Sequence, residues 1–190
     1  MPVLPIFLYG QSSLRKKARA VKRLDPELTK LADDMIETMR LANGIGLAAN
    51  QVGDMRRVIV VDVGAAEETK DQPPLAMINP EVVAVEGSWP MEEGCLSIPG
   101  IREEVVRPET IRVRFLDREF SEKEISAAGT LGRVILHEID HLNGVLFIDR
   151  LSGVRRKLLR GRLNKIQRGE VEVDYPIVGS SPPATGTEGR

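Results

Sequence analysis

The amino-acid sequence predicts an α+β fold built as a single domain. Apolar residues recur with helical spacing near the N-terminus, whereas residues 56–63 and 110–117 carry the apolar patterns of β-strands. Strands and helices follow one another without the regular β-α alternation of a parallel sheet, which favours α+β. The 190 residues suit one domain, and a hydrophobic content of 42% is ordinary for a globular core.

The first expected helix begins at Pro26, with Asp25 as its N-cap, and ends at Asn43–Gly44. The apolar residues on one face of this helix are Leu28, Leu31, Met35 and Met39. Residues 56–63 form an apolar run rich in β-branched side chains, which is typical of a buried strand. The polar residues 64–74 are expected to form a loop.

The middle of the chain predicts further strands. Residues 75–87 indicate two short strands hinged at Asn79–Pro80. Residues 110–117 alternate strictly between apolar and polar side chains, as in an antiparallel strand with one face in water. Residues 120–126 are expected to pair with this strand through a turn at 117–119.

The last third of the chain predicts two helices. The first runs from about Ser126 to Leu142, with Leu131, Val134, Ile135 and Leu142 facing inward. Residues 145–149 suggest a short strand, and residues 154–168 an amphipathic helix with seven basic side chains and no acidic one. Its apolar face consists of Leu158, Leu159, Leu163 and Ile166. Residues 171–190 are expected to form an extended, disordered tail, because the final residues are rich in Gly, Pro, Ser and Thr.

The composition excludes several kinds of partner. The 27 Lys and Arg residues balance 28 Asp and Glu residues, so the chain has no overall positive field that favours nucleic acid. Its one cysteine, Cys95, excludes an internal disulfide and fits a reducing compartment. We find neither a targeting pattern at the N-terminus nor an apolar stretch of membrane-spanning length. We therefore expect a cytoplasmic protein that binds neither DNA nor a membrane.

Residues 135–144, ILHEIDHLNG, contain both histidines of the chain, His137 and His141. Residues four apart on a helix lie on one face, about 6 Å from each other, so the two imidazoles can chelate one metal ion. Glu138 flanks this pair and suits a general base that acts on a water molecule. Two nitrogens do not complete a metal site, so a third ligand is needed.

Cys95 is the best candidate for that third ligand. A metzincin requires histidine at position 147, where this chain has Phe147, and the first downstream glutamate is Glu170 at the end of the basic helix. Cys95 stands in the stretch EEGCLSIPG, residues 92–100. A thiolate and two imidazoles suit zinc or ferrous iron and leave a fourth tetrahedral position open.

A third segment, NGIGLAANQVG at residues 43–53, places Gln51 in a run of small and apolar residues. By itself this segment fits either a binding loop or a helix end followed by a tight turn, with Gln51 at the surface. Together, and in order, the three segments resemble the peptide deformylase family of bacterial type. Its Gly-x-Gly-x-Ala-Ala-x-Gln, Glu-Gly-Cys-x-Ser and His-Glu-x-Asp-His signatures correspond to residues 44–51, 93–97 and 137–141.

The resemblance implies a catalytic domain over residues 1–170, with antiparallel strands around a central HExxH helix. It implies removal of the N-formyl group from the N-terminal methionine of newly synthesised polypeptides, with release of formate. One divalent ion is expected, Fe(II) in the cell with Zn, Ni or Co as substitutes, and its ligands are Cys95, His137 and His141. Glu138 transfers the proton, while the Gln51 side-chain amide and the Leu96 backbone N–H stabilise the oxyanion. For the substrate, Gly46 is expected along the peptide backbone, and Ile45 and Val134 around the methionine side chain.

The residues alone leave other functions open. A metallopeptidase would use the same metal, water and glutamate, but the chain lacks a matching downstream ligand. A non-enzymatic zinc module needs four protein ligands, and no second cysteine or third histidine is present to complete them. An amidase with Cys95 as nucleophile would not need the HExxH spacing. The basic helix 154–168 either contacts ribosomal RNA near the exit tunnel or is a solvated helix face.

Overall fold

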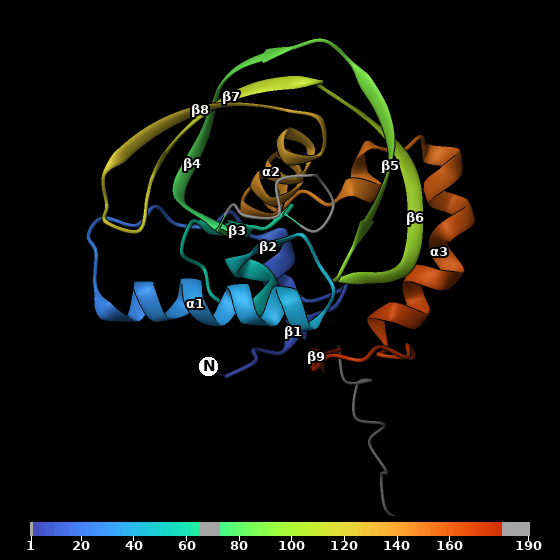
Figure 1. Ribbon diagram of the computed structural model, residues 1–190. Helices are drawn as coiled ribbons and strands as arrows, with labels where there is room; N and C mark the ends of the chain where they lie inside the picture. Colours follow the sequence, from blue (N-terminus) through green and yellow to red (C-terminus); the bar gives the residue numbers. More distant parts are fainter. Residues whose placement is uncertain (1, 65–72, 180–190) are drawn as a thin grey trace, which may run out of the picture.

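The computed structural model describes residues 2–64 and 73–179 of the chain. Helix α2 (Gly129–Leu142) lies inside a curved wall of strands, helix α1 (Pro26–Leu41) runs along one side, and helix α3 (Gly153–Gln167) covers the other (Figure 1). A five-stranded sheet has the order β2-β3-β4-β7-β8, and β5 pairs with β6 in a separate hairpin. The predicted α+β fold with a central HExxH helix is confirmed.

The strands of the five-stranded sheet are β2 (Gly46–Ala48), β3 (Val58–Val61), β4 (Leu75–Glu86), β7 (Thr110–Leu116) and β8 (Glu122–Ala128). The other strands are β1 (Ile6–Phe7), β5 (Trp89–Cys95), β6 (Ile98–Arg107) and β9 (Ile177–Val178), and the 3-10 helices are η1 (Ser12–Arg15), η2 (Ala49–Val52) and η3 (Phe147–Arg150). All four residues of β3 are buried, as the apolar run predicted. The loop predicted for residues 64–74 lies mostly outside the described residues.

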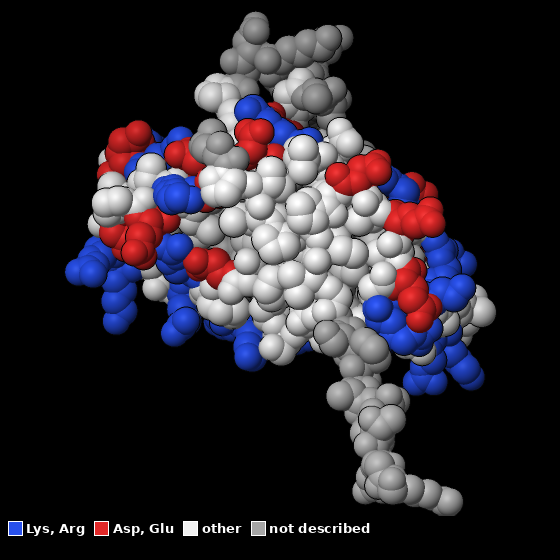
Figure 2. Space-filling model, turned by 90° about the horizontal axis from the view of Figure 1, so that it is seen from below, with Lys and Arg blue, Asp and Glu red and all other residues white. Residues whose placement is uncertain are grey.

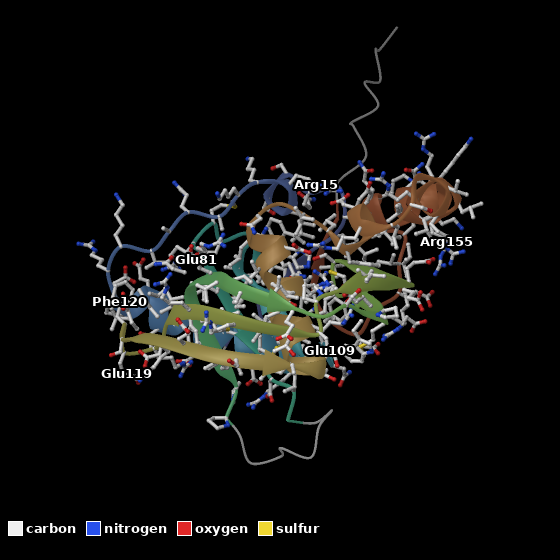
Figure 3. All side chains as sticks on the ribbon, turned by 90° about the horizontal axis from the view of Figure 1, so that it is seen from above. Arg15, Glu81, Glu109, Glu119, Phe120 and Arg155 are labelled. Carbon is white, nitrogen blue, oxygen red and sulfur yellow. The ribbon has the colours of Figure 1, made fainter. Side chains whose placement is uncertain are left out.

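The predicted hairpin of β7 and β8 is confirmed. The inward side chains of β7 are Ile111, Val113 and Phe115, which are all buried. Strand β8 pairs antiparallel with β7, and the turn between them holds Phe120 at a φ of 62° (Figure 3). The alternating pattern therefore directs one face of this hairpin toward α2 and leaves the other face in water.

Helix α1 begins where the sequence predicted. The Asp25 side chain accepts the Leu28 backbone N–H at 2.7 Å, and Pro26 occupies the first turn. The helix ends before Asn43, which has a φ of 53°. Its predicted apolar face is buried against β3 in one core cluster.

Two predicted boundaries are wrong. Residues 75–86 form the single strand β4, and the expected hinge is a bulge in which the Asn79 side chain bonds both the N–H and the C=O of Val21. Helix α2 begins at Gly129 because Ser126–Ala128 still pair with β7. Gly129 itself has a φ of 58°, which separates the strand from the helix.

The short strand predicted at residues 145–149 is also wrong, because residues 147–150 form η3. The Asp149 side chain accepts the Leu146 backbone N–H at 2.8 Å and also pairs with Arg15, which closes a tight helical turn. Helix α3 is confirmed, but Leu158 does not belong to its packed face, since it is 69% exposed while Leu159, Leu163 and Ile166 are buried.

After α3 the chain returns to the body of the molecule. Strand β9 pairs in parallel with β1, with Ile177 opposite Ile6. Of the segment 171–190, the structure describes residues 171–179, and residues 180–190 lie outside its description. None of the helices among the described residues has the length and apolar character needed to cross a membrane.

Candidate metal centre

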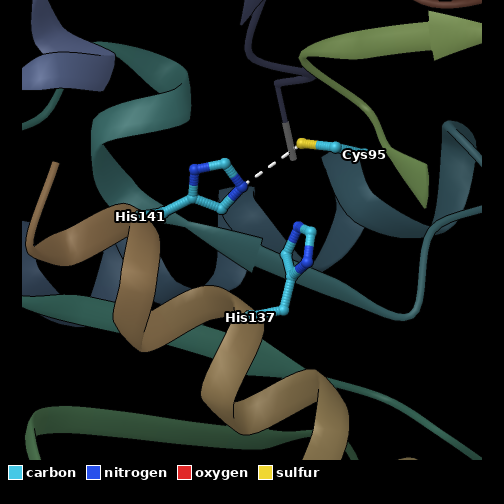
Figure 4. Close-up of side chains that lie close together, drawn as sticks. All are labelled: Cys95, His137 and His141. Carbon is cyan, nitrogen blue, oxygen red and sulfur yellow. Dashed lines mark hydrogen bonds between the residues drawn. The ribbon is translucent and has the colours of Figure 1, made fainter. Parts of the chain in front are cut away.

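The three predicted metal ligands lie together at the end of hairpin β5–β6 (Figure 4). His137 and His141 stand one turn apart on the buried face of α2, and the Cys95 Sγ lies 3.2 Å from the His141 Nε2. One donor atom from each residue can be chosen so that all three lie within 4.8 Å of one another. The register of β5 and β6 shifts between Gly94 and Cys95, and the chain then turns into β6.

The two rejected ligand positions have other contacts. Phe147 stacks on the His137 ring, with centroids 6.1 Å apart. Glu170 is half-exposed and forms a 2.5 Å ion pair with Arg168. The ligand set is therefore one sulfur and two imidazole nitrogens, which suits zinc, ferrous iron and similar divalent ions.

The electrostatics of the cluster also fit a cation. Burial lowers the pKa of His137, but hydrogen bonds to Cys95 and Glu93 outweigh it and raise that pKa to about 10. Burial and the charge of His137 lower the pKa of His141 well below its usual value. Cys95 and Glu93 therefore favour a positive charge beside His137, and the neutral imidazole of His141 has a lone pair that could bind a metal ion.

Glu93 orients the first histidine. Its carboxylate lies 2.9 Å from the His137 Nδ1, which leaves Nε2 for a metal. It also receives two hydrogen bonds from Arg107, at 2.5 and 2.9 Å, and one from Arg133 at 2.7 Å. Although burial raises the pKa of Glu93, the hydrogen bonds from His137 and Arg107 hold it well below its usual range.

The sequence analysis assigned no role to the residues that hold His137 in place, which are Glu93, Arg107 and Arg133. Glu93 belongs to a signature, but its partners Arg107 and Arg133 carry no motif of their own. Arg107 also donates to Asp140, the residue before His141, at 2.7 Å. The available signal was weak: Arg107 continues the inward positions of β6, where Ile101, Glu103 and Val105 are buried.

Glu138 is a buried carboxyl group beside the ligands. Its Oε2 has no hydrogen-bond partner within the described part of the chain. Its Oε1 packs against Gly46, where a Cβ would lie only 2.5 Å away. Burial is the main cause that raises the pKa of Glu138 to about 7. A carboxyl group with a pKa near neutrality can both accept and donate a proton.

Gln51 is buried on η2, so the alternative of a surface turn is wrong. Its Oε1 accepts the Ala48 backbone N–H at 2.8 Å. Its Nε2 donates to the Ser97 Oγ at 3.1 Å and lies 3.6 Å from the Cys95 Sγ. The amide is thus held beside the connection between β5 and β6, which carries Leu96.

A cleft of about 660 Å³ opens beside these residues. Its lining includes the predicted substrate residues Ile45, Gly46 and Val134, together with Gln51, Cys95, Leu96, His137 and Glu138. Residues 172–175 also line the cleft, although the sequence reasoning placed them in a tail. The candidate site therefore combines four separate parts of the chain.

Comparisons with known proteins point to one family. A family model described as polypeptide deformylase matches residues 3–157. A peptide deformylase of Salinibacter ruber is 50% identical over 184 residues, covering 93% of this chain and 94% of that protein. A peptide deformylase of Chlorobium luteolum is 46% identical, with 92% of each chain covered.

Solved structures are similar over the same region. A crystal structure of a peptide deformylase from Legionella pneumophila has a TM-score of 0.81 and 39% identity, covering 89% of this chain and 98% of that one. A peptide deformylase from Synechococcus elongatus, crystallised in complex with actinonin, has a TM-score of 0.77 and 39% identity, covering 94% of each chain.

Proposed function

Because the chain belongs to the peptide deformylase family and is a hydrolase of that kind, we propose how its own residues remove the N-formyl group from the N-terminal methionine of newly synthesised polypeptides. The observation that carries the proposal is the convergence of Cys95, His137 and His141 beside Glu138, at the wall of an open cleft. The products are formate and the free amino group.

Cys95, His137 and His141 would hold one divalent cation, which when bound lowers the pKa of a water molecule. Glu138 accepts the proton of the attacking water as the new C–O bond forms. It then donates that proton to the departing amine as the C–N bond breaks. Its burial supports both steps, because the raised pKa of about 7 lies near the working pH.

The oxyanion that develops on the formyl group requires hydrogen-bond donors. The Gln51 side-chain amide and the Leu96 backbone N–H are proposed for this role. The bond between the Gln51 Oε1 and the Ala48 N–H supports it, because this bond fixes which end of the amide faces the cleft. Losing one such donor typically costs about 3–4 kcal/mol of transition-state stabilisation.

Substrate selection follows from the tight walls of the cleft. The formyl carbon carries only hydrogen, so a larger acyl group would collide where Gly46 packs directly on Glu138. Ile45 and Val134 are proposed for the pocket of the methionine side chain, since both are apolar and both line the cleft. The peptide backbone would then run along Gly46.

The decisive experiment measures formate release from formyl-Met-Ala by anaerobically purified protein, with metal content determined on the same sample. Glu138→Gln should keep its metal and lose at least about 10²-fold in turnover. Cleavage of an unformylated polypeptide would favour the metallopeptidase, and activity that resists a chelator would favour an amidase with Cys95 as nucleophile.

Ferrous iron is proposed as the metal in the cell, with zinc, nickel or cobalt able to replace it. One thiolate and two imidazoles are compatible with iron and with zinc, and the choice of iron rests on the resemblance to the family. Iron and sulfur both oxidise, so activity should fall in air, and catalase should slow the loss. Equal activity with zinc and full stability in air would argue against iron.

The basic helix α3 supports a contact with ribosomal RNA, in the cytoplasm where new chains emerge. Figure 2 shows Lys and Arg along the edge of the molecule where α3 lies and also along the opposite edge. Within the described residues, the basic side chains of α3 that are exposed and make neither an ion pair nor a hydrogen bond are Arg156, Lys157, Arg160 and Lys165, whereas Arg162 donates to the Gly100 carbonyl oxygen. Arg155, labelled in Figure 3, instead pairs with Glu103.

Glutamine at these four positions should weaken ribosome co-sedimentation and flatten its dependence on salt. Arg112→Gln with Arg114→Gln on the solvent face of β7 is the control, because these arginines are exposed but lie on a different element. Unchanged, salt-insensitive sedimentation of the α3 variant would end the docking proposal.

A further inference from the structure

The segment that follows α3 is anchored against the body of the enzyme. The Ile6 backbone N–H donates to the Pro176 carbonyl at 2.8 Å, and the Leu8 N–H donates to the Val178 carbonyl at 2.9 Å. These bonds form the parallel pair of β1 and β9, which is visible at the lower edge of Figure 1. Just before this anchor, residues 172–175 line the cleft.

Tyr175 connects this segment to the short connection between β5 and β6. Its hydroxyl donates to the Leu96 carbonyl oxygen at 2.9 Å, and these two residues are 79 positions apart in the sequence. The Tyr175 ring is partly buried and packs against the core cluster that includes Met39 and Leu47. Burial, followed by the nearby charge of Cys95, raises the pKa of Tyr175 to about 12, so the hydroxyl remains a donor near neutral pH.

The position of this bond matters because Leu96 lies in the short connection between β5 and β6. The ligand Cys95 precedes Leu96. Ser97 follows it, and its hydroxyl oxygen accepts a hydrogen bond from the Gln51 side-chain amide. A bond to the Leu96 carbonyl restrains the peptide plane on the far side of this residue from Cys95. The Leu96 N–H lies in the adjoining peptide plane between Cys95 and Leu96, which the antiparallel pairing of Cys95 with Ile98 restrains. The direction of this N–H is therefore restrained from both sides of Leu96.

We propose that Tyr175 is a positioning residue for deformylation: through the Leu96 carbonyl it aims the Leu96 N–H at the oxyanion. This inference rests on the proposed oxyanion role of Leu96. It makes the segment after α3 part of the active site, although that segment lies beyond the stretch 3–157 that the family model matches. A misaimed donor weakens binding of the transition state more than binding of the ground state, so the effect belongs in kcat.

The test compares Tyr175→Phe with Tyr9→Phe in the full-length, metal-loaded enzyme. These are the two tyrosines of the chain, and Tyr9 is partly buried in another core cluster outside the lining of the cleft. With formyl-Met-Ala, Tyr175→Phe should lower kcat by about 3- to 10-fold, the range expected for one neutral hydrogen bond, and change KM less than twofold. Tyr9→Phe should keep the wild-type kcat.

Hydrogen–deuterium exchange provides a second readout. In Tyr175→Phe, exchange should accelerate in the peptide that covers residues 95–98, while the metal content and the Tm stay at the level of Tyr9→Phe. A kcat within twofold of wild type would overturn the proposal. So would a loss of kcat that is matched by lost metal or by a lowered Tm, because Tyr175 would then be a structural residue. If wild-type protein releases no formate, the proposed function fails rather than this inference.

Discussion

At the scale of single residues, the site depends on how closely Gly46 approaches Glu138. A Cβ on Gly46 would lie 2.5 Å from the Glu138 Oε1 and 2.6 Å from the Val134 Cγ1. Gly46 cannot easily move away, because β2 is paired with β3 through Gly46 and Val61. The absence of a side chain here lets a buried carboxyl group stand directly beside the strand that is proposed to hold the peptide.

We therefore expect Gly46→Ala to lower kcat/KM by about 10²-fold or more, because a displacement of about 1 Å at a catalytic group can have that effect. Gly161→Ala on α3 is the matched control, since a Cβ there meets nothing within 4 Å. It should keep full activity and raise the Tm slightly, because alanine favours a helix over glycine by about 1 kcal/mol. Formate release measures the activity of each variant, and thermal unfolding measures its Tm. A Gly46→Ala enzyme whose kcat/KM stays within threefold of wild type would contradict the argument.

The sequence predicted some residues of the site and not others. The ligands were predictable because helical spacing places His137 and His141 on one face, and Cys95 is the one thiol of the chain. The roles of Arg107 and Tyr175 were not predictable, because each acts through a contact with a residue distant in the sequence. No local pattern encodes such contacts.

At the scale of elements, a buried ion network connects hairpin β5–β6 to α2. Arg107 of β6 is 2% exposed and bonds both Glu93 of β5 and Asp140 of α2. Asp140 is further paired with Arg150, at 2.7 Å. Because Glu93 and Arg107 are almost fully buried and form a direct ion pair, the network holds the hairpin and the helix in one relative position, and the metal ligands with them.

Arg107→Ala should therefore lower the free energy of unfolding by about 3 kcal/mol, because it leaves buried carboxylates with fewer partners. Arg102→Ala is the control on the same strand. Its partner Glu92 lies on β5, as does Glu93, the partner of Arg107. The side chains of Arg102 and Glu92 are 65% and 62% exposed, so the free energy of unfolding should fall by less than about 1 kcal/mol. Urea unfolding of both variants at equal metal content provides the comparison, and equal losses would show that the network contributes little.

The elements themselves differed in how well the sequence predicted them. Helix α1 and strand β7 follow a clean period and have clear ends, so local rules were sufficient. Hairpin β5–β6 was missed because buried charges, Glu103 and Arg107, occupy inward positions of β6 and disguise its alternation. Residues 145–149 were assigned to a strand because the cap from Asp149 and its pairing with Arg15 cannot be read from apolar pattern alone.

At the scale of the whole molecule, the metal site lies where otherwise separate parts meet. Cys95 ends a hairpin that packs on α3 and η3, whereas the two histidines belong to the helix enclosed by the five-stranded sheet. A cation held by all three ligands crosslinks these parts in the native state only. Any ligand that binds the native but not the unfolded chain stabilises the fold by mass action.

Removing the metal with a chelator should therefore lower the Tm as well as the activity. Free metal at about 100 times its Kd stabilises a protein by about 2.7 kcal/mol. For a chain of this length, the Tm changes by about 2–4 °C for each kcal/mol of stability. We therefore expect the chelator to lower the Tm by about 5–11 °C. Cys95→Ala is the control: it lacks the thiolate, so its Tm should already be low and should respond little to the chelator. Differential scanning calorimetry with and without chelator, followed by restoration with a divalent ion, measures the effect. A wild-type Tm that ignores the chelator, or a Cys95→Ala protein that responds equally, would mean that the ion does not join the hairpin to the helix.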